Sequence, residues 1–294
     1  MRLAALVACL IAAPPARAES CQRVASLPLR DDGGFLSVRA SIAGTPVRLM
    51  LDTGSNAGLI TPNAVQVLGL RIDPGTKVAV QGTGGSAQRV AVAQAARLTL
   101  GPLVLGDIAM PIATLPAAPR LTPPVGGFLG GDVLSHFDLD IDVPRGRIAL
   151  WRITPGCTPP AWLGTADSAP LVAHGDRLSL TVTLDGEKVS ALLDTGARSR
   201  VVSDATARRV GVNAATLATE PGGISSGVGL APQFYHWHRF ANFTVGHAVE
   251  SNPVLTVAPL DSRFDMLLGT DWLAHREVWI SYAADTLFFS KPGA

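Results

Sequence analysis

The pattern of apolar and polar residues predicts a chain built mainly of short β-strands. Residues 36–42 alternate apolar and polar side chains, residues 47–51 are almost entirely apolar, and a Gly-Thr-Pro turn separates the two segments. Residues 137–150 alternate in the same way around a Pro-Arg-Gly turn, which is typical of a β-hairpin. These segments predict paired strands with one buried face.

Two short segments carry apolar residues at helical rather than strand spacing. Residues 59–70 contain Pro62 at the expected start of a helix and a glycine near the end. Residues 201–212 repeat this pattern, with two candidate N-cap residues, Ser203 and Asp204. We therefore expect few and short helices.

The same sequence pattern occurs twice in the chain. Residues 49–55 read LMLDTGS and residues 192–197 read LLDTGA, so Asp52 and Asp194 lie 142 positions apart (194 − 52). Around them, Leu36, Val38, Ala40, Ile42, Gly44, Val47 and Leu51 fall on Leu178, Leu180, Val182, Leu184, Gly186, Val189 and Leu193. A second block, FLGGDVL at 128–134, matches LLGTDWL at 267–273 with a shift of 139 (267 − 128). The chain is a tandem duplication, which predicts two similar lobes.

The repeated aspartates are the candidate catalytic residues. A carboxylate at the end of an apolar strand is costly to ionise, because nothing replaces the water it loses. If Asp52 and Asp194 meet within hydrogen-bonding distance, they share one proton and titrate as a coupled pair, with one acting as base and the other as acid. We expect the Ser55 hydroxyl to favour the charged form of Asp52 and to make it the more acidic member.

The two Asp-Thr-Gly sites and their repeated surroundings resemble the pepsin and retropepsin superfamily of aspartic peptidases, in particular retropepsin-like proteins with both repeats in one chain. The resemblance implies an all-β, two-lobed pseudo-symmetric β-barrel fold with few helices. It implies that Asp52 and Asp194 activate a water that hydrolyses an extended peptide, without a cofactor or metal. The residues expected to support this pair are Thr53, Gly54, Ser55, Thr195, Gly196 and Ala197.

Two glycine-rich hairpin tips are candidate flaps over the substrate. The first lies at residues 80–86 and the second at residues 225–229, each downstream of an Asp-Thr-Gly site. Glycines suit a tip that bends and lets another backbone approach, although ordinary turns share this composition. The expected substrate-binding residues are Gly82, Thr83, Gly84, Gly85, Ser226 and Gly227.

The segments at 128–130 and 267–269 match the hydrophobic-hydrophobic-glycine element that passes beneath the Asp-Thr-Gly loop in this superfamily. Each is followed by an acidic residue, Asp132 or Asp271, at the start of a short expected helix. We expect both side chains to act as N-caps.

The N-terminus reads as an export signal. Residues 1–18 combine an early arginine, a short uncharged apolar run and an Ala-Arg-Ala cleavage site. Cys9 also ends a segment resembling a lipoprotein box, but little apolar sequence precedes it. Cleavage after Ala18 would leave Cys21 and Cys157, either as a disulfide or as two buried thiols; we expect the disulfide. We therefore expect the protein to be periplasmic or secreted.

Composition and charge exclude several partners. Removing Arg2 and Arg17 leaves 22 basic side chains (24 − 2) against 23 acidic ones, so nothing favours nucleic acid or an anionic membrane. No stretch beyond the signal is apolar enough to insert stably in a bilayer. His236 and His238 share a strand face in an aromatic segment, but without a third ligand we expect packing there rather than a metal site.

The sequence therefore predicts a signal at 1–18, an N-terminal retropepsin-like lobe at 19–153, a proline- and glycine-rich linker at 154–164 and a C-terminal lobe at 165–294. Because both half-sites are covalently linked, a monomer suffices. The expected function is aspartic endopeptidase acting on a peptide or protein substrate at moderately acid pH. The alternatives are an envelope protein that binds peptides without cleaving them and a structural domain associated with export.

Overall fold

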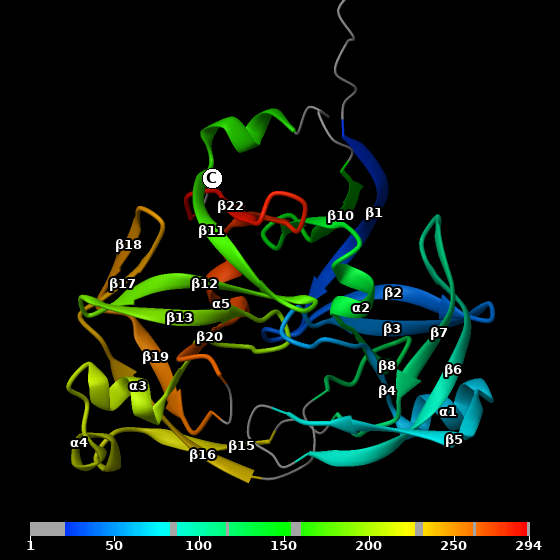
Figure 1. Ribbon diagram of the computed structural model, residues 1–294, viewed down its shortest axis with the longest axis horizontal. Coiled ribbons are helices and arrows are strands. Elements are labelled where there is room, and N and C mark those ends of the chain that lie inside the picture. The colour runs from blue at the N-terminus through cyan, green and yellow to red at the C-terminus, as the bar shows by residue number, and fades with distance from the viewer. Residues whose placement is uncertain are drawn as a thin grey trace, which may run out of the picture.

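The computed structural model describes residues 21–82, 87–115, 118–153, 160–226, 232–260 and 263–292. Its architecture is mainly β-strands with a few short helices, arranged as two lobes that face each other (Figure 1). The predicted fold class is confirmed. The predicted signal at 1–18 and most of the predicted linker lie outside the described residues, while the end of the linker forms a 3-10 turn at Ala161–Thr165.

The N-terminal lobe follows the predicted strand and helix pattern closely. Thr61 caps the first helix through the Ala64 amide, and Gly69 closes it in a left-handed conformation (φ 60°), which glycine adopts without strain. The elements of this lobe are β2 (Leu36–Ile42), β3 (Thr45–Leu51), β4 (Leu59–Ile60), α1 (Pro62–Leu68), β5 (Arg71–Val80), β6 (Gln88–Leu100), β7 (Leu103–Pro111), β8 (Val125–Leu129) and α2 (Gly131–Leu134).

The C-terminal lobe repeats this arrangement. Of the two candidate caps for its first helix, Ser203 is the N-cap, and its hydroxyl accepts from the Thr206 amide. The elements are β12 (Arg177–Leu184), β13 (Glu187–Leu193), β14 (Val201–Ser203), α3 (Asp204–Arg209), α4 (Ala214–Ala218), β15 (Gly222–Ser226), β16 (Pro232–Arg239), β17 (Asn242–Val245), β18 (Ala248–Ser251), β19 (Val254–Ala258), β20 (Met266–Leu268) and α5 (Thr270–Leu273).

A third sheet joins the lobes and fixes their relative position. Its strands run in the antiparallel order β1 (Gln22–Asp31), β10 (Arg147–Arg152), β9 (Asp138–Asp142), β21 (Glu277–Ser281), β22 (Thr286–Phe289) and β11 (Asp167–His174). The two predicted closing hairpins, β9–β10 and β21–β22, are confirmed, and they pair with each other at its centre. The pseudo-twofold relation between the repeats therefore runs through this sheet.

Buried polar contacts also cross between the two hairpins. The carboxylate of Asp138 accepts from Trp279 Nε1 at 3.0 Å and from Ser281 Oγ at 2.6 Å. Arg147 bridges Asp140 and Glu277 at 2.8 Å each. Because these bonds satisfy carboxylates that burial would otherwise penalise, they hold the lobes in one arrangement around the cleft.

Candidate active site

Each Asp-Thr-Gly loop emerges from a strand that is held from beneath by the second repeated motif. β3 runs parallel to β8, and β13 runs parallel to β20. The Asp52 amide donates to Leu129 O at 3.0 Å, and the Asp194 amide donates to Leu268 O at 3.1 Å. The predicted passage of the hydrophobic-hydrophobic-glycine segments under the loops is therefore present in both lobes.

The acidic residues after these segments do not cap the short helices, contrary to the prediction. Helices α2 and α5 begin after Gly130 and Gly269 without a side-chain cap. Instead Asp132 accepts from the Gly58 amide at 2.8 Å, and Asp271 accepts from the Arg200 amide at 2.7 Å. Each carboxylate therefore points at the segment that follows an Asp-Thr-Gly loop. Its role is to hold the backbone of that segment in place.

The two threonines lock the loops to each other across the interface between the lobes. Thr53 Oγ1 donates to Leu193 O at 2.8 Å and accepts from the Thr195 amide at 3.1 Å. Thr195 Oγ1 makes the reciprocal bonds, to Leu51 O at 2.9 Å and from the Thr53 amide at 3.0 Å. Both side chains are buried. This reciprocal set of bonds places the two loops in fixed register.

Replacing Thr53 by valine is expected to destabilise the protein by about 2 kcal/mol, because it leaves the buried Thr195 amide and Leu193 carbonyl without partners. Equilibrium unfolding in urea measures the loss. Thr53→Ser keeps the hydroxyl and is the matched control, expected within about 1 kcal/mol of the native protein. Equal stability of the valine and serine variants would contradict this role.

The aspartate side chains meet at the floor of the cleft. A Cβ built on Gly54 would lie 2.5 Å from Asp194 Oδ1, and one built on Gly196 would lie 2.5 Å from Asp52 Cγ. Each carboxyl group therefore occupies the space that a side chain in the opposite loop would fill. The two carboxyl groups lie close enough for each to shift the pKa of the other. The proximity that the sequence pattern required is met.

The pKa values of both carboxyl groups are raised. For Asp52 burial is the largest cause, followed by the charge of Asp194, and they hold its pKa well above the usual range. Burial also raises the pKa of Asp194, but amide bonds from Gly196 (2.9 Å) and Ala197 (3.1 Å) and the nearby charge of Arg177 oppose the rise. Amide hydrogen bonds from Gly54 and Ser55 oppose the rise in the pKa of Asp52 in the same way, so the charge of Arg177 is what distinguishes the two sides. We therefore expect Asp194 to carry the shared negative charge and Asp52 to keep the proton.

The expectation that the Ser55 hydroxyl favours the charged form of Asp52 is wrong. The Ser55 hydroxyl donates to Ala57 O at 2.8 Å. A hydroxyl proton engaged with a carbonyl does not stabilise the carboxylate charge, so the asymmetry of the pair comes from the other lobe.

The raised pKa values predict that stability changes with pH in a defined direction. The native state retains a proton at pH values where the unfolded chain has lost it, so the pair costs stability as pH rises above about 4. Asp52→Asn removes this cost. We expect its melting temperature to exceed the native value by about 3 °C at pH 7, and by nothing below about pH 3.5.

The control for this measurement is Asp73→Asn. Hydrogen bonds from Thr76 and Gly75 lower the pKa of this surface carboxyl, so its charge favours the folded state. Its replacement is not expected to raise the melting temperature at any pH. A gain shared by both variants would show that general charge removal, and not the pair, is responsible.

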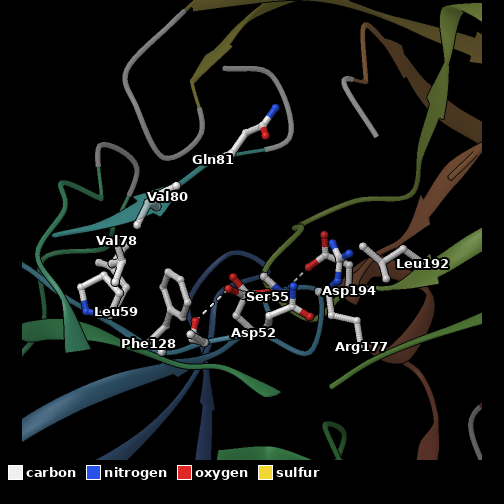
Figure 2. A pocket seen from close by; sticks show the side chains of 18 of the residues that line it. Asp52, Ser55, Leu59, Val78, Val80, Gln81, Phe128, Arg177, Leu192 and Asp194 are labelled. Carbon is white, nitrogen blue, oxygen red and sulfur yellow. Dashed lines mark hydrogen bonds between the residues drawn. The ribbon is translucent and has the colours of Figure 1, made fainter. Parts of the chain in front are cut away.

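A cavity of about 990 Å³ opens above the two aspartates. Figure 2 shows apolar side chains on one side of it, from Leu59, Val78, Val80 and Phe128, and Arg177 beside Asp194 on the other. Leu192, Phe264 and Leu267 complete the second wall. This volume accommodates several residues of an extended peptide.

The described part of the first predicted flap lies over this cavity. Strands β5 and β6 form the expected hairpin, and Gln81 and Gly82 line the cavity. Thr83, Gly84 and Gly85 lie outside the described residues. In the second hairpin, β15 pairs with β16 and ends at Ser226, while Gly227 lies outside the described residues. The side chain of Ser226 also lies outside the described part of the chain.

Cys21 is buried, and Cys157 lies outside the described residues, so the disulfide stays a prediction.

In the aromatic segment, His238 Nδ1 lies 2.8 Å from a Glu220 oxygen and its ring packs on Phe240. Within the described ranges no three His, Cys, Asp or Glu side chains are grouped to hold a metal ion, and no helix is long and apolar enough to cross a bilayer.

Arg177, whose charge acts on Asp194, was not among the residues predicted from the sequence. It lies 17 residues before Asp194 (194 − 177), the distance that separates Phe35 from Asp52 (52 − 35). The duplication therefore contains a signal that could have found it, a charged residue at a position that is aromatic in the other copy.

Comparison with known proteins agrees with this geometry. The model of a family described as aspartyl protease matches residues 38–133 and 180–272, which together exceed half of the chain. The chain belongs to the aspartyl protease family. Its fold is similar to that of the aspartic proteinase from Irpex lacteus, with a TM-score of 0.52 and 13% identity over 91% of this chain and 97% of that one. A comparison with curated proteins found no match.

Proposed function

We propose that this protein is an aspartic endopeptidase that cleaves extended peptide segments. The observation that carries the proposal is the pair of adjacent carboxyl groups, Asp52 and Asp194, at the floor of the cleft. One shared negative charge and one shared proton supply a base and an acid at the same point.

In the proposed mechanism, a water bound between the carboxyl groups gives a proton to the ionised Asp194. The water oxygen attacks the scissile carbonyl carbon, while Asp52 gives its proton to the carbonyl oxygen. The nitrogen of the tetrahedral gem-diol then takes the proton from Asp194, and Asp52 takes a proton from one of the two hydroxyls. The C–N bond breaks, and an amine and a carboxylic acid leave. Both carboxyl groups return to the starting proton count.

The shape of the cleft supports an extended substrate. The cavity runs between the first hairpin and the floor, so a peptide there contacts the backbone near Gln81 and Gly82 above and the aspartates below. The wall formed by Leu59, Val80 and Phe128 suits an apolar side chain beside the cut.

The proposal is tested by incubating the protein, without residues 1–18, with a diverse peptide library between about pH 3 and 7 and identifying the products by mass spectrometry. Defined internal cleavage is expected, fastest at moderately acid pH. The double variant Asp52→Asn/Asp194→Asn is the control for contaminating peptidases. Binding without cleavage would instead favour the peptide-binding alternative, and absence of both would exclude either function.

Export belongs to the same proposal. We infer cleavage after Ala18, a periplasmic or secreted location, and a disulfide between Cys21 and Cys157. N-terminal sequencing of the protein recovered from an exporting host checks the cleavage site. Thiol labelling without reductant checks the disulfide, and two labelled cysteines would contradict it.

A further inference from the structure

The two halves of the cleft differ in charge although they arise from one duplicated sequence. At the position 17 residues before the aspartate (52 − 35 and 194 − 177), the N-terminal copy carries Phe35, which packs on the apolar cluster of Met50, Leu59 and Phe128. The C-terminal copy carries Arg177, which lines the cavity. An apolar wall and a cationic wall therefore face the same substrate.

Arg177 is held in place by packing, and the acidic group beside it is Asp194. Its guanidinium lies 5.6 Å from the ring centroid of Phe264, and its buried Nε has no hydrogen-bond partner. Within the described residues it forms no salt bridge, whereas Arg200 of the same lobe is paired with Glu250 and Asp271 at 2.6 and 2.9 Å. Although its charge acts on Asp194, Arg177 is thus not tied up in a salt bridge and can interact with a group that occupies the cleft.

The described cavity lining has an excess of positive charge. Its cationic side chains are Arg177 and Arg263, and its acidic side chains are the two aspartates. Because the aspartates share a proton, they contribute one negative charge against two positive charges. A neutral substrate leaves this imbalance in a partly desolvated site, while a carboxylate removes it.

We propose that Arg177 selects substrates with an acidic side chain, aspartate or glutamate, on the side of the scissile bond that contacts the C-terminal lobe. The substrate would then combine an apolar residue against the wall around Phe128 with a carboxylate at Arg177. This inference rests on the proposed peptidase function and specifies its substrate class.

The test compares pairs of peptides, capped at both ends, that differ only by Glu or Gln at each position around a cut site found in the library. At about pH 6 we expect kcat/KM for the Glu peptide to exceed that for the Gln peptide about tenfold, at one or two positions on a single side of the cut. Below about pH 3.5 the ratio should fall to about one, because the glutamate is then protonated. Taking the ratio for one enzyme cancels the titration of the aspartates.

Variants assign the preference to Arg177. Arg177→Gln should bring the Glu:Gln ratio to about one, and Arg177→Lys should retain part of it. Arg198→Gln is the matched control: it removes an exposed arginine that stacks on Phe35 outside the cavity lining, and the tenfold ratio should remain. A ratio near one in the native protein at every position, or a tenfold ratio that survives in a folded Arg177→Gln protein, would overturn the inference.

A binding measurement separates this inference from the proposed function. Fluorescence titration of Asp52→Asn with the same peptide pairs reports the preference without hydrolysis. Cleavage of peptides with no Glu preference refutes the role of Arg177 alone. Absence of all cleavage, with a Glu preference in binding that Arg177→Gln removes, refutes the peptidase and retains the acidic specificity.

Discussion

Asp194→Asn and Asp52→Asn are each expected to lower kcat at least about 10³-fold against a library-derived substrate. An amide side chain at position 194 cannot take the proton from water, and one at position 52 cannot give a proton to the carbonyl oxygen. Each variant therefore blocks a different proton transfer of the same catalytic cycle. Progress curves followed by mass spectrometry measure the loss.

Structure and peptide affinity should survive both substitutions. Asparagine matches aspartate in size, and in Asp194→Asn the new side-chain carbonyl oxygen could still accept from the amides of Gly196 and Ala197. The control is Asp132→Asn, which alters a carboxylate of the same lobe as Asp52 that supports the loop from behind. We expect it to keep more than about a tenth of the activity. Full activity in either Asp52→Asn or Asp194→Asn would remove the mechanism.

The second large effect is expected from Gly130→Ala. A Cβ there would overlap the Ala57 carbonyl group and lie 2.6 Å from the Gly58 amide nitrogen, so backbone atoms of the catalytic loop would have to move. Overpacking of this kind, with no flexible side chain to yield, is expected to cost more than about 3 kcal/mol. Thermal unfolding should show a drop of more than about 6 °C, or no folded protein at all.

The equivalent glycine of the second repeat offers an independent repeat of this test, and a glycine with open space around it offers a control. Gly269 occupies the equivalent crossing, and a Cβ there would lie 2.8 Å from Ala197 O, so Gly269→Ala should be similarly harmful. Gly164 has no atom within 4 Å of a built Cβ, and Gly164→Ala should leave stability within about 0.5 kcal/mol of the native protein. A tolerated alanine at position 130 would contradict the tight crossing under the loop.

Local sequence features predicted the elements well. The strands at Leu36–Ile42 and Thr45–Leu51 and the helices that follow each Asp-Thr-Gly loop depend on alternation, spacing and caps within a few residues. The same is true of the closing hairpins. In these segments the forces that decide the structure act between neighbours along the chain.

The predictions that were wrong or missing concern contacts that are set by the folded structure. Asp132 was assigned as a helix cap because its sequence neighbours suggest one, but its hydrogen-bond partner is an amide 74 residues away. Ser55 was assigned to the carboxylate near it in sequence, but its hydroxyl faces Ala57 O instead. Arg177 was overlooked because nothing in its own segment marks it as part of the cleft.

By itself, the sequence determined that two copies of one unit exist, that each ends a buried strand in an aspartate, and that the copies form a two-lobed β fold. Only the tertiary structure decided that the two carboxyl groups meet and which wall of the cleft is cationic. The reason is physical: backbone pairing follows patterns along the chain, whereas desolvation and charge interaction depend on distances through space that spacing in the sequence does not encode.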